Sequence, residues 1–462
     1  MESPGRAEFL IGATKSGSGK TLITLGILAA LAKRGVDVQP FKCGPDFIDP
    51  TLHQMVVPRP SINLDLQMMG KDGCLQSHEY YTENAEAVVV EGVMGLFDGG
   101  RASSASLAEV LDVPVLLIVD VRSAAESVAA VIKGFESYSE NTRLLGVICN
   151  RIGSSRHRQL IEDAVRQSCQ TPILGFFPRD VDFEMPSRHL GLHMGHEIDQ
   201  DKVRMDKLVD AIENSIDLDY LLERARQKIG DRPQAALPVS HKPPASSPVR
   251  LAVARDEAFC FYYPENFKIF EQCGFEIVPF SPLHDECLPE DISGVYLGGG
   301  YPELHARQLS ANISMRKSLQ RWAEDGRFIY GECGGFMYMT RDIQDQEGQV
   351  HEMSSIFPVS VAMKKRLSRL GYRSPKLAGQ CAFGEGGEQF FGHEFHYSDI
   401  IERADDLEFL YTLEGGRGEG CKRGNAYGSY IHLHFAQNVK NIRTLLTGLA
   451  GTKVCVGPLM SE

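Results

Sequence analysis

Residues 8–21, EFLIGATKSGSGKT, join a short apolar run to a glycine-rich turn and to the start of a helical pattern. The turn ends in the G-K-T of the phosphate-binding pattern G-x-x-x-x-G-K-[ST], with a threonine where that pattern has its first glycine. Gly17 and Gly19 let the backbone turn its N–H groups inward, and the following helix offers its N-terminus to phosphate. We therefore expect ATP binding, with Lys20 at the terminal phosphates and Thr21 at Mg²⁺. The alternative is a glycine- and serine-rich turn from strand to helix that binds nothing.

Short apolar runs rich in β-branched residues alternate with longer helical patterns along the rest of the chain. Such runs are typical of parallel sheets that helices cover on both faces. We predict an α/β protein with two doubly wound, mostly parallel-sheet domains, whose ligands lie at the C-terminal ends of strands. Residues 229–248, rich in Pro, Ala and Ser, predict a linker between a domain of residues 1–228 and one of residues 249–462. The most informative runs are AEAVVVEG (85–92), VPVLLIVD (113–120), VRLAVAR (249–255), ISGVYLGGG (292–300) and GRFIYGE (326–332).

The composition is that of an ordinary soluble protein, with 43% hydrophobic and 24% charged residues. A net charge of −13 argues against a nucleic-acid partner. The eleven cysteines have no C-x-x-C spacing, so neither a disulfide framework nor a zinc ribbon is indicated. The first residues, MESPGRAEFLIG, contain no long apolar stretch. We therefore expect no signal peptide, no membrane span and a cytoplasmic location.

A magnesium–nucleotide site needs carboxylates, because Mg²⁺ prefers oxygen ligands. Glu91 closes the apolar run AVVVE, and Asp46 follows the predicted strand VDVQPFK. Asp49 and Asp98 are weaker candidates. For each acid taken singly, the alternative is a helix cap or a surface side chain.

A second candidate site lies in GRFIYGECGGFMYM, residues 326–339, where an apolar strand passes through glycines into an apolar helix. Such glycines permit a sharp turn that exposes Cys333, which is the geometry of a nucleophile elbow. The helix N-terminus favours a thiolate there. The amide of Gly334, and the amides around Gly299 and Gly300, are candidates for an oxyanion hole.

A cysteine nucleophile needs an imidazole to take and return the proton, and YIHLHF, residues 430–435, offers His432 and His434. These two histidines share a face if the segment is a strand. A zinc cluster with the histidines and glutamate of GHEFHYS, residues 392–398, is the alternative. Competition for the base of the thiolate and the lack of cysteine spacing count against zinc.

The N-terminal motifs resemble the dethiobiotin-synthetase and partition-ATPase group, whose modified phosphate loop carries a lysine at the position of Lys15. QPFKCGPDFIDPTLH (39–53) and VVVEGVMGLFDG (88–99) resemble its corrin-ring a,c-diamide synthase branch. The resemblance implies that the metal is shared by the loop threonine, a downstream aspartate and a glutamate after a strand. It also implies that the asparagine of GVICNR recognises adenine, and that an arginine or a histidine of PSRHLGL meets carboxylates of the substrate. Those residues are Thr21, Asp46, Glu91, Asn150, Arg188 and His189; a cap for Asn150 and a polar loop for the last two are the alternatives.

The C-terminal motifs YLGGGYPE, YGECGGFMYM, GHEFHYS and GSYIHLHF resemble the cobyrinate-type class I glutamine amidotransferases. This resemblance implies that the base is His432. The ordinary class I pattern has a glutamate two residues later, where this chain has His434. Another acid, a backbone carbonyl or His434 itself remain as candidates for orienting His432.

Across nearly the whole chain, the motifs resemble the cobyrinate a,c-diamide synthase family in the order in which that family has them. The resemblance implies amidation of the a and c acetate groups of cobyrinate, with ATP, Mg²⁺ and glutamine. Hydrogenobyrinate and nickel-sirohydrochlorin are alternative substrates. A partition-type nucleotide switch is the non-enzyme alternative, and Lys15, which such ATPases use across a dimer interface, leaves a homodimer open. A stand-alone dethiobiotin-like ligase is disfavoured, because it leaves the second half of the chain unexplained.

Overall fold

The computed structural model describes residues 5–181, 183, 187–188, 191–192, 204–227 and 248–451. The chain divides into two compact units, Met1–Leu237 and Pro238–Glu462. The predicted linker lies outside the described residues except for Pro248, so the domain limits proposed from the sequence stay predictions. Among the helices that can be described, none is both long and apolar enough to cross a membrane.

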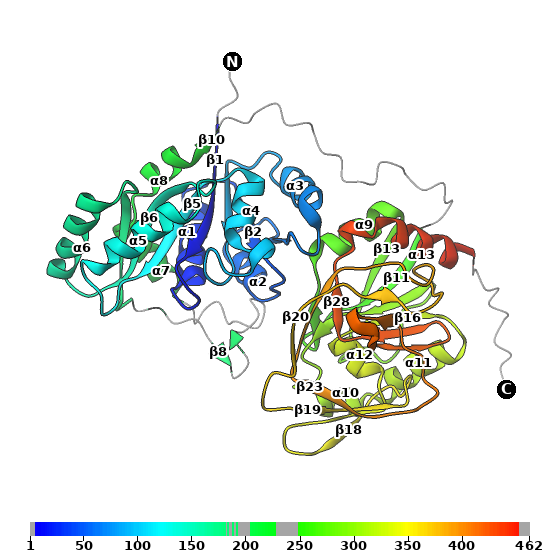
Figure 1. Ribbon diagram of the computed structural model, residues 1–462. Coiled ribbons are helices and arrows are strands. Elements are labelled where there is room, and N and C mark those ends of the chain that lie inside the picture. Colours follow the sequence, from blue (N-terminus) through cyan, green and yellow to red (C-terminus); the bar gives the residue numbers. More distant parts are fainter. Residues whose placement is uncertain are drawn as a thin grey trace. The chain divides into compact units, whose positions relative to one another are not determined.

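The first unit is a parallel sheet with strand order β3-β2-β4-β1-β5-β6-β7 and one short antiparallel strand, β10, on β1 (Figure 1). Because β4 lies between β2 and β1, the C-terminal ends of these strands are neighbours, with Glu91 beside both Ile11 and Lys42. The strands are β1 (Arg6–Ala13), β2 (Val38–Cys43), β3 (Ile62–Leu64), β4 (Ala87–Glu91), β5 (Val115–Asp120), β6 (Leu144–Ile152), β7 (Ile173–Pro178), the hairpin β8 (Ser187–Arg188) and β9 (Gly191–Leu192), and β10 (Arg226–Gln227). The helices are α1 (Lys20–Lys33), α2 (Asp49–Gln54), α3 (Gly70–Tyr81), η1 (Gly100–Ala102), α4 (Ser104–Leu111), α5 (Ser127–Tyr138), α6 (Ser155–Ser168), α7 (Met205–Ser215) and α8 (Leu218–Ala225).

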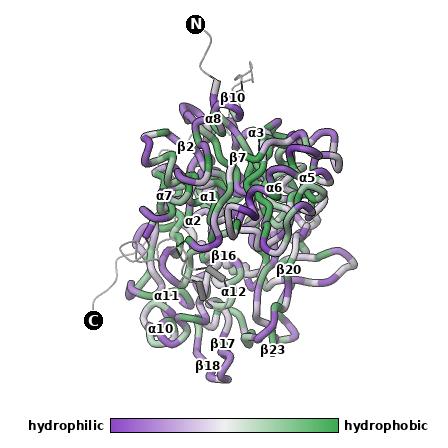
Figure 2. The backbone as a smooth tube through the Cα atoms, turned by 90° about the vertical axis from the view of Figure 1, so that its left-hand side faces the viewer, coloured by the Kyte–Doolittle hydropathy of each residue, from purple (hydrophilic) through white to green (hydrophobic). Residues whose placement is uncertain are grey.

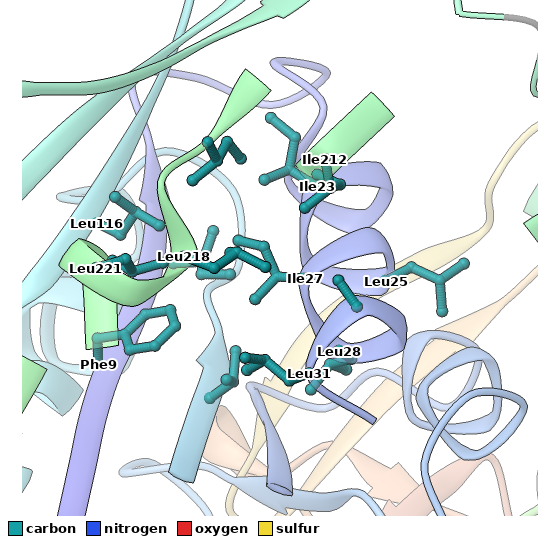
Figure 3. Packing of buried hydrophobic residues seen from close by; sticks show 14 of the residues in the cluster. Phe9, Ile23, Leu25, Ile27, Leu28, Leu31, Leu116, Ile212, Leu218 and Leu221 are labelled. Carbon is teal, nitrogen blue, oxygen red and sulfur yellow. The ribbon is translucent and has the colours of Figure 1, made fainter. Parts of the chain in front are cut away.

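Helix α1, which follows the phosphate loop, is buried on most of its surface. Its apolar side chains belong to one hydrophobic cluster with residues of the sheet and of α7 and α8, for example Ile27 with Phe9 and Leu218 (Figure 3). Burial of each such side chain contributes about 1.5–3 kcal/mol. The start of the helix is therefore held against the sheet.

The second unit contains a six-stranded sheet of order β13-β11-β14-β16-β27-β26, parallel except for the edge pair β27–β26. A separate three-stranded antiparallel sheet, β20-β22-β28, carries the predicted base. The strands are β11 (Val249–Ala254), β12 (Phe259–Phe261), β13 (Phe275–Phe280), β14 (Gly294–Leu297), β15 (Gly299–Gly300), β16 (Phe328–Glu332), β17 (Asp342–Gln344), β18 (Val350–Glu352), β19 (Val359–Met363), β20 (Arg369–Arg373), β21 (Lys376–Leu377), β22 (Gly392–His396), β23 (Ser398–Arg403), β24 (Tyr411–Thr412), β25 (Gly418–Glu419), β26 (Cys421–Arg423), β27 (Ala426–Ser429) and β28 (Ile431–Leu433). The helices are α9 (Pro264–Cys273), α10 (Ala306–Ala311), α11 (Ile313–Glu324), α12 (Gly334–Met339), η3 (Glu414–Gly416), η4 (Phe435–Gln437) and α13 (Val439–Gly451).

The polar and apolar residues separate as this architecture requires. Figure 2 shows hydrophilic residues along outer segments such as α11 and the β17–β18 hairpin. The strands that precede the two predicted sites, β1 and β16, are buried along nearly their whole length. The predicted fold class, α/β with two mostly parallel sheets, is confirmed.

Candidate active sites

The glycine-rich turn between β1 and α1 has the backbone conformation that its glycines permit. Gly17 and Gly19 have φ values of 74° and 95°, in the region that favours glycine. A Cβ at Gly19 would lie 2.3 Å from Nδ2 of Asn150, which donates a hydrogen bond to the Ser18 carbonyl at 2.7 Å. Asn150, at the end region of β6, is thus placed against the loop. Lys15, in the same turn, is exposed.

Lys20 and Thr21 begin α1 and point toward the neighbouring strand ends. The Lys20 ammonium donates to the carbonyl oxygen of Met94, and the Thr21 hydroxyl donates to Glu91 Oε1 at 2.8 Å. Burial, together with the nearby Lys42, lowers the pKa of Lys20. The structure therefore brings together the two loop residues and the strand-end glutamate that the sequence predicts for this site.

A buried lysine lies among the predicted acids. Lys42, at the end of β2, has a side chain only 4% exposed and forms an ion pair with Asp49. Its Nζ also lies 3.3 Å from Glu91 Oε1 and 3.8 Å from Asp46 Oδ2. Burial disfavours the ammonium, but these three carboxylates outweigh it and raise the pKa of Lys42 well above its usual value. The cation compensates charges that a buried site would not hold otherwise.

Glu91 is the most constrained acid of the cluster. His53 Nε2, on α2, lies 2.8 Å from Glu91 Oε2, while His53 Nδ1 lies 2.9 Å from the Ser61 hydroxyl. Burial raises the pKa of Glu91, but Lys42, His53 and the Thr21 hydroxyl together hold it below its usual range. Glu91 is therefore ionised at neutral pH, as a metal ligand must be.

The remaining N-terminal candidates have further contacts or lie outside the described residues. Asp46 Oδ1 accepts hydrogen bonds from the amides of Ile48 and Asp49, so it also caps the start of α2. Asp98 is exposed and its Oδ2 accepts from the Gly95 amide at 3.0 Å, in agreement with the alternative of a surface side chain. His189 lies outside the described residues, and Arg188 is placed only as part of the β8 strand.

Sequence reasoning missed the roles of Lys42 and His53, although both stand in the segment 39–53. A signal was present, since a lysine in an apolar strand is rarely buried without a partner. It also missed Arg151, which donates to the Gly17 carbonyl at 3.0 Å and pairs with Asp120 Oδ2 at 2.5 Å.

In the second unit, Cys333 occupies a strained turn between β16 and α12. Its φ of 45° and ψ of −101° are unusual for a residue with a Cβ and cost about 1–3 kcal/mol. The turn is closely packed: a Cβ at Gly335 would lie 2.1 Å from the Leu297 carbonyl, and one at Gly334 would lie 3.0 Å from the Gly300 amide nitrogen. The predicted elbow is present, and its glycines are needed for close packing.

The sequence predicts an exposed cysteine whose thiolate is favoured, and the structure corrects this: the thiol of Cys333 is buried, and burial disfavours its thiolate. It donates to the Phe395 carbonyl oxygen, with Sγ 3.9 Å from that oxygen. Burial, and next the charge of Glu303, raise the pKa of Cys333 well above the value of a free thiol, although the Gly334 amide opposes this. A base is therefore needed to form the thiolate.

His432 lies in β28, opposite His393 of β22, and is buried. Its ring rests on Gly299, where a Cβ would lie only 2.2 Å from Cε1. Cys333 and His432 thus lie against one segment, because Gly334 contacts Gly300 while His432 contacts Gly299. Burial, followed by His393 and His396, lowers the pKa of His432 to about 3, so the ring is neutral at pH 7, the form in which a base takes up a proton.

Two carboxylates lie at the same distance from the two histidines of YIHLHF. Glu332 Oε2 is 4.0 Å from His432 Nδ1, and Glu265 Oε2 is 4.0 Å from His434 Nε2. His434 Nδ1 accepts a hydrogen bond from the Ala436 amide at 3.3 Å. Glu332 is the acid next to the nucleophile that sequence reasoning missed, although its position in GEC, after an apolar strand, marked it as unusual.

Glu394, the glutamate of GHEFHYS, forms ion pairs of its own. Glu394 pairs with Arg373 Nε at 2.6 Å and with His396 Nε2 at 3.0 Å. Across the described parts of the chain, no three His, Cys, Asp or Glu side chains gather as a metal site. The two histidines of the zinc hypothesis, His432 and His434, have different surroundings.

Comparison with known proteins adds two family matches that divide the chain as the fold does. Residues 9–192 match the CobQ/CobB/MinD/ParA nucleotide binding domain, and residues 250–440 match the CobB/CobQ-like glutamine amidotransferase domain.

Curated relatives match the chain over almost its whole length. The cobyrinate a,c-diamide synthase of Caldanaerobacter subterraneus is 36% identical over 95% of this chain and 97% of its own length. The enzyme of that name from Syntrophotalea carbinolica is 40% identical over 92% of this chain and 95% of its own. The enzyme of that name from Salmonella typhimurium is 38% identical over 93% of this chain and 95% of its own length.

Proposed function

The chain belongs to the cobyrinate a,c-diamide synthase family, and from this premise we propose that it amidates the a and c acetate carboxylates of cobyrinate with ATP and glutamine, in cobalamin biosynthesis. One observation carries the proposal: a phosphate loop with its acids and a cysteine elbow with its base occur on one chain. A carboxylate is a poor electrophile because oxide is a poor leaving group. ATP supplies the activation, and glutamine supplies the nitrogen.

In the first step, the substrate carboxylate attacks the γ-phosphorus of ATP, giving an acyl phosphate and ADP. Lys20 would neutralise charge on the transferred phosphoryl group. Thr21, Glu91 and Asp46 offer the hydroxyl and carboxylate oxygens that Mg²⁺ prefers, and would hold it. When bound, Mg²⁺ supplies further neutralisation of the phosphates. Lys42 and His53 keep Glu91 ionised for this role.

Further N-terminal contacts belong to the same proposal. Asn150, which touches the loop through Ser18, would also bind adenine. Arg188 and His189 would meet carboxylates of the substrate. Lys15 is exposed, as a residue that reaches into a homodimer partner must be.

In the second unit, Cys333 Sγ attacks the amide carbon of glutamine while His432 takes the thiol proton. The C–N bond breaks as His432 returns that proton to the leaving ammonia, and water then cleaves the glutamyl thioester to glutamate. The amides of Gly334 and Gly300 would bind the oxyanion. Ammonia attacks the acyl phosphate, so that phosphate leaves and the amide forms.

The decisive experiment offers cobyrinate, hydrogenobyrinate and nickel-sirohydrochlorin in parallel with ATP, Mg²⁺ and glutamine, and identifies the products by mass spectrometry. We expect the diamide from cobyrinate. Diamide formation from nickel-sirohydrochlorin alone would refute the substrate assignment. A purified protein that makes no glutamate from glutamine would refute the enzyme in favour of the nucleotide switch.

A further inference from the structure

We infer that Glu332, the residue before the nucleophile, is the positioning residue that orients His432 and stabilises its protonated form during glutamine hydrolysis. The inference rests on the proposed function, because it assigns a role at the same Cys333–His432 site. It places the acid partner of the base at a position different from the ordinary class I pattern, in which the glutamate follows the histidine by two residues.

The carboxylate of Glu332 is held in place by three donors. Oε1 accepts hydrogen bonds from the Tyr330 hydroxyl at 2.9 Å and from the Leu433 amide at 3.1 Å. Oε2 accepts from the Tyr296 hydroxyl at 2.9 Å and faces His432 Nδ1 at 4.0 Å. The acid is 2% exposed, so water does not screen it from the imidazole. The Leu433 amide ties it to the residue next to His432 in β28.

His434 has contacts of its own on the other side. Its Nδ1 accepts from the Ala436 amide, its Nε2 faces Glu265, and its ring packs against Tyr263 at 5.1 Å between centroids. Among the candidates that could orient the base, Glu332 is an acid whose carboxylate faces His432 Nδ1, at 4.0 Å.

The chemistry of the base requires such a group. A carboxylate that accepts from Nδ1–H fixes the tautomer in which Nε2 carries the lone pair that receives the thiol proton. As His432 becomes imidazolium, the charge develops beside Glu332 Oε2. Catalytic hydrogen bonds in free enzymes are often long and become shorter when the substrate binds. We expect the 4.0 Å distance between Glu332 Oε2 and His432 Nδ1 to shorten in the same way.

Glu332 also predicts a pH dependence. Burial raises its pKa to about 7, against the hydrogen bonds from Leu433, Tyr296 and Tyr330. The carboxylate is therefore lost as pH falls through neutrality, and the orienting charge is lost with it. The groups that face it electrostatically are Tyr262, Tyr296, Tyr330, Tyr411, Cys333 and His432, and burial moves the pKa of each away from neutrality.

The test measures glutamine hydrolysis by Glu332→Gln across pH 5.5–9, a range set about the expected midpoint, with amidation driven by free ammonia measured in parallel. We expect kcat for glutamine to fall by about 10²-fold, because the amide can favour the wrong tautomer of His432. The wild-type decline below about pH 7 should disappear in the variant. Ammonia-driven amidation should stay within about twofold, because the phosphate site is untouched.

Glu265→Gln is the matched control, since it neutralises a buried acid at the same distance from the other histidine. Its kcat should stay within about twofold of wild type. Tyr296→Phe keeps Glu332 but removes one donor to Oε2, so the acidic limb should move to higher pH.

Three results would overturn the inference: a Glu332→Gln loss below about threefold, an equal loss in Glu265→Gln, or an unchanged acidic limb in Tyr296→Phe. Each leaves the proposed function standing if wild type still makes glutamate and the diamide. Failure of wild type to do so is a separate outcome.

Discussion

Replacement of Lys42 by methionine tests the electrostatics of the phosphate site, because it removes the charged end of the side chain and keeps an unbranched chain only one atom shorter. The buried ammonium lies 3.3 Å from Glu91 Oε1 and 3.8 Å from Asp46 Oδ2, and it pairs with Asp49. At an effective dielectric constant of about 20, the Glu91 contact alone corresponds to ~5 kcal/mol. The Lys42→Met variant does not lose all of this interaction energy, because one carboxylate of the cluster binds a proton and becomes neutral.

Protonation sets the size of the effect. Protonating one carboxylate of ordinary pKa at pH 7 costs about 4 kcal/mol, at 1.36 kcal/mol per pH unit. We therefore expect Lys42→Met to lower the free energy of unfolding of the first unit by about 3–4 kcal/mol, within the range for breaking a buried ion pair. The carboxylate pKa in the folded variant then lies above its unfolded value. The free energy of unfolding of the Lys42→Met variant should be greatest at low pH and fall by about 1.4 kcal/mol per pH unit as the pH rises from 5 to 7.

Unfolding in urea should be followed by hydrogen exchange of the β4 amides and not by tryptophan fluorescence. The single tryptophan of the chain, Trp322, lies in α11 of the second unit and reports on that unit. Lys33→Met is the control, because its ammonium lies 3.7 Å from Asp210 in an exposed pair. That variant should change stability by less than about 0.5 kcal/mol. The reasoning would be refuted if Lys42→Met lowered the free energy of unfolding by less than about 1 kcal/mol. It would also be refuted if the stability of the variant depended on pH in the same way as that of wild type.

Three further predictions separate the two sites. Cys333→Ala should abolish glutamate formation but keep amidation at high free ammonia, whereas Lys20→Ala should abolish amidation with either nitrogen source. Mass spectra of the products distinguish these outcomes, and the reverse pattern would exchange the two site assignments. His432→Ala should reduce glutaminase activity by about 10²-fold or more beyond His434→Ala, and the opposite order would identify the other histidine as the base. Gly299→Ala would place a Cβ 2.2 Å from His432 Cε1. It should therefore lower glutaminase kcat by about 10²-fold while ammonia-driven amidation continues. An unchanged kcat would mean that glutamine hydrolysis does not depend on the position of the His432 ring.

The parts of the molecule that the sequence predicts well are those specified by short segments. The apolar runs become buried strands, the GSGKT turn begins α1, and GECGG forms a strained elbow. Each depends on local rules, such as the backbone freedom of glycine and the spacing of apolar residues. The strand-end position of Glu91 is predicted for the same reason.

The partners of these residues depend on which strands become neighbours. Lys42 reaches Glu91 because β4 pairs with β2 as well as with β1, and no single segment contains that information. Glu332 receives two of its three hydrogen bonds from Tyr296 and Leu433, which are 36 and 101 residues away. Buried charge compensation is therefore the part of each site that sequence reasoning missed.

The two histidines of YIHLHF show that titration alone does not identify a base. Both rings are buried, each faces a carboxylate at 4.0 Å, and burial lowers the pKa of each to about 3. The difference lies in the rest of their surroundings. His432 rests on Gly299, beside the segment that packs on the cysteine elbow, whereas His434 contacts the Ala436 amide. The proposed role of His432 therefore follows from the location of the nucleophile, and His434 is a control with the same ring, burial and acid distance.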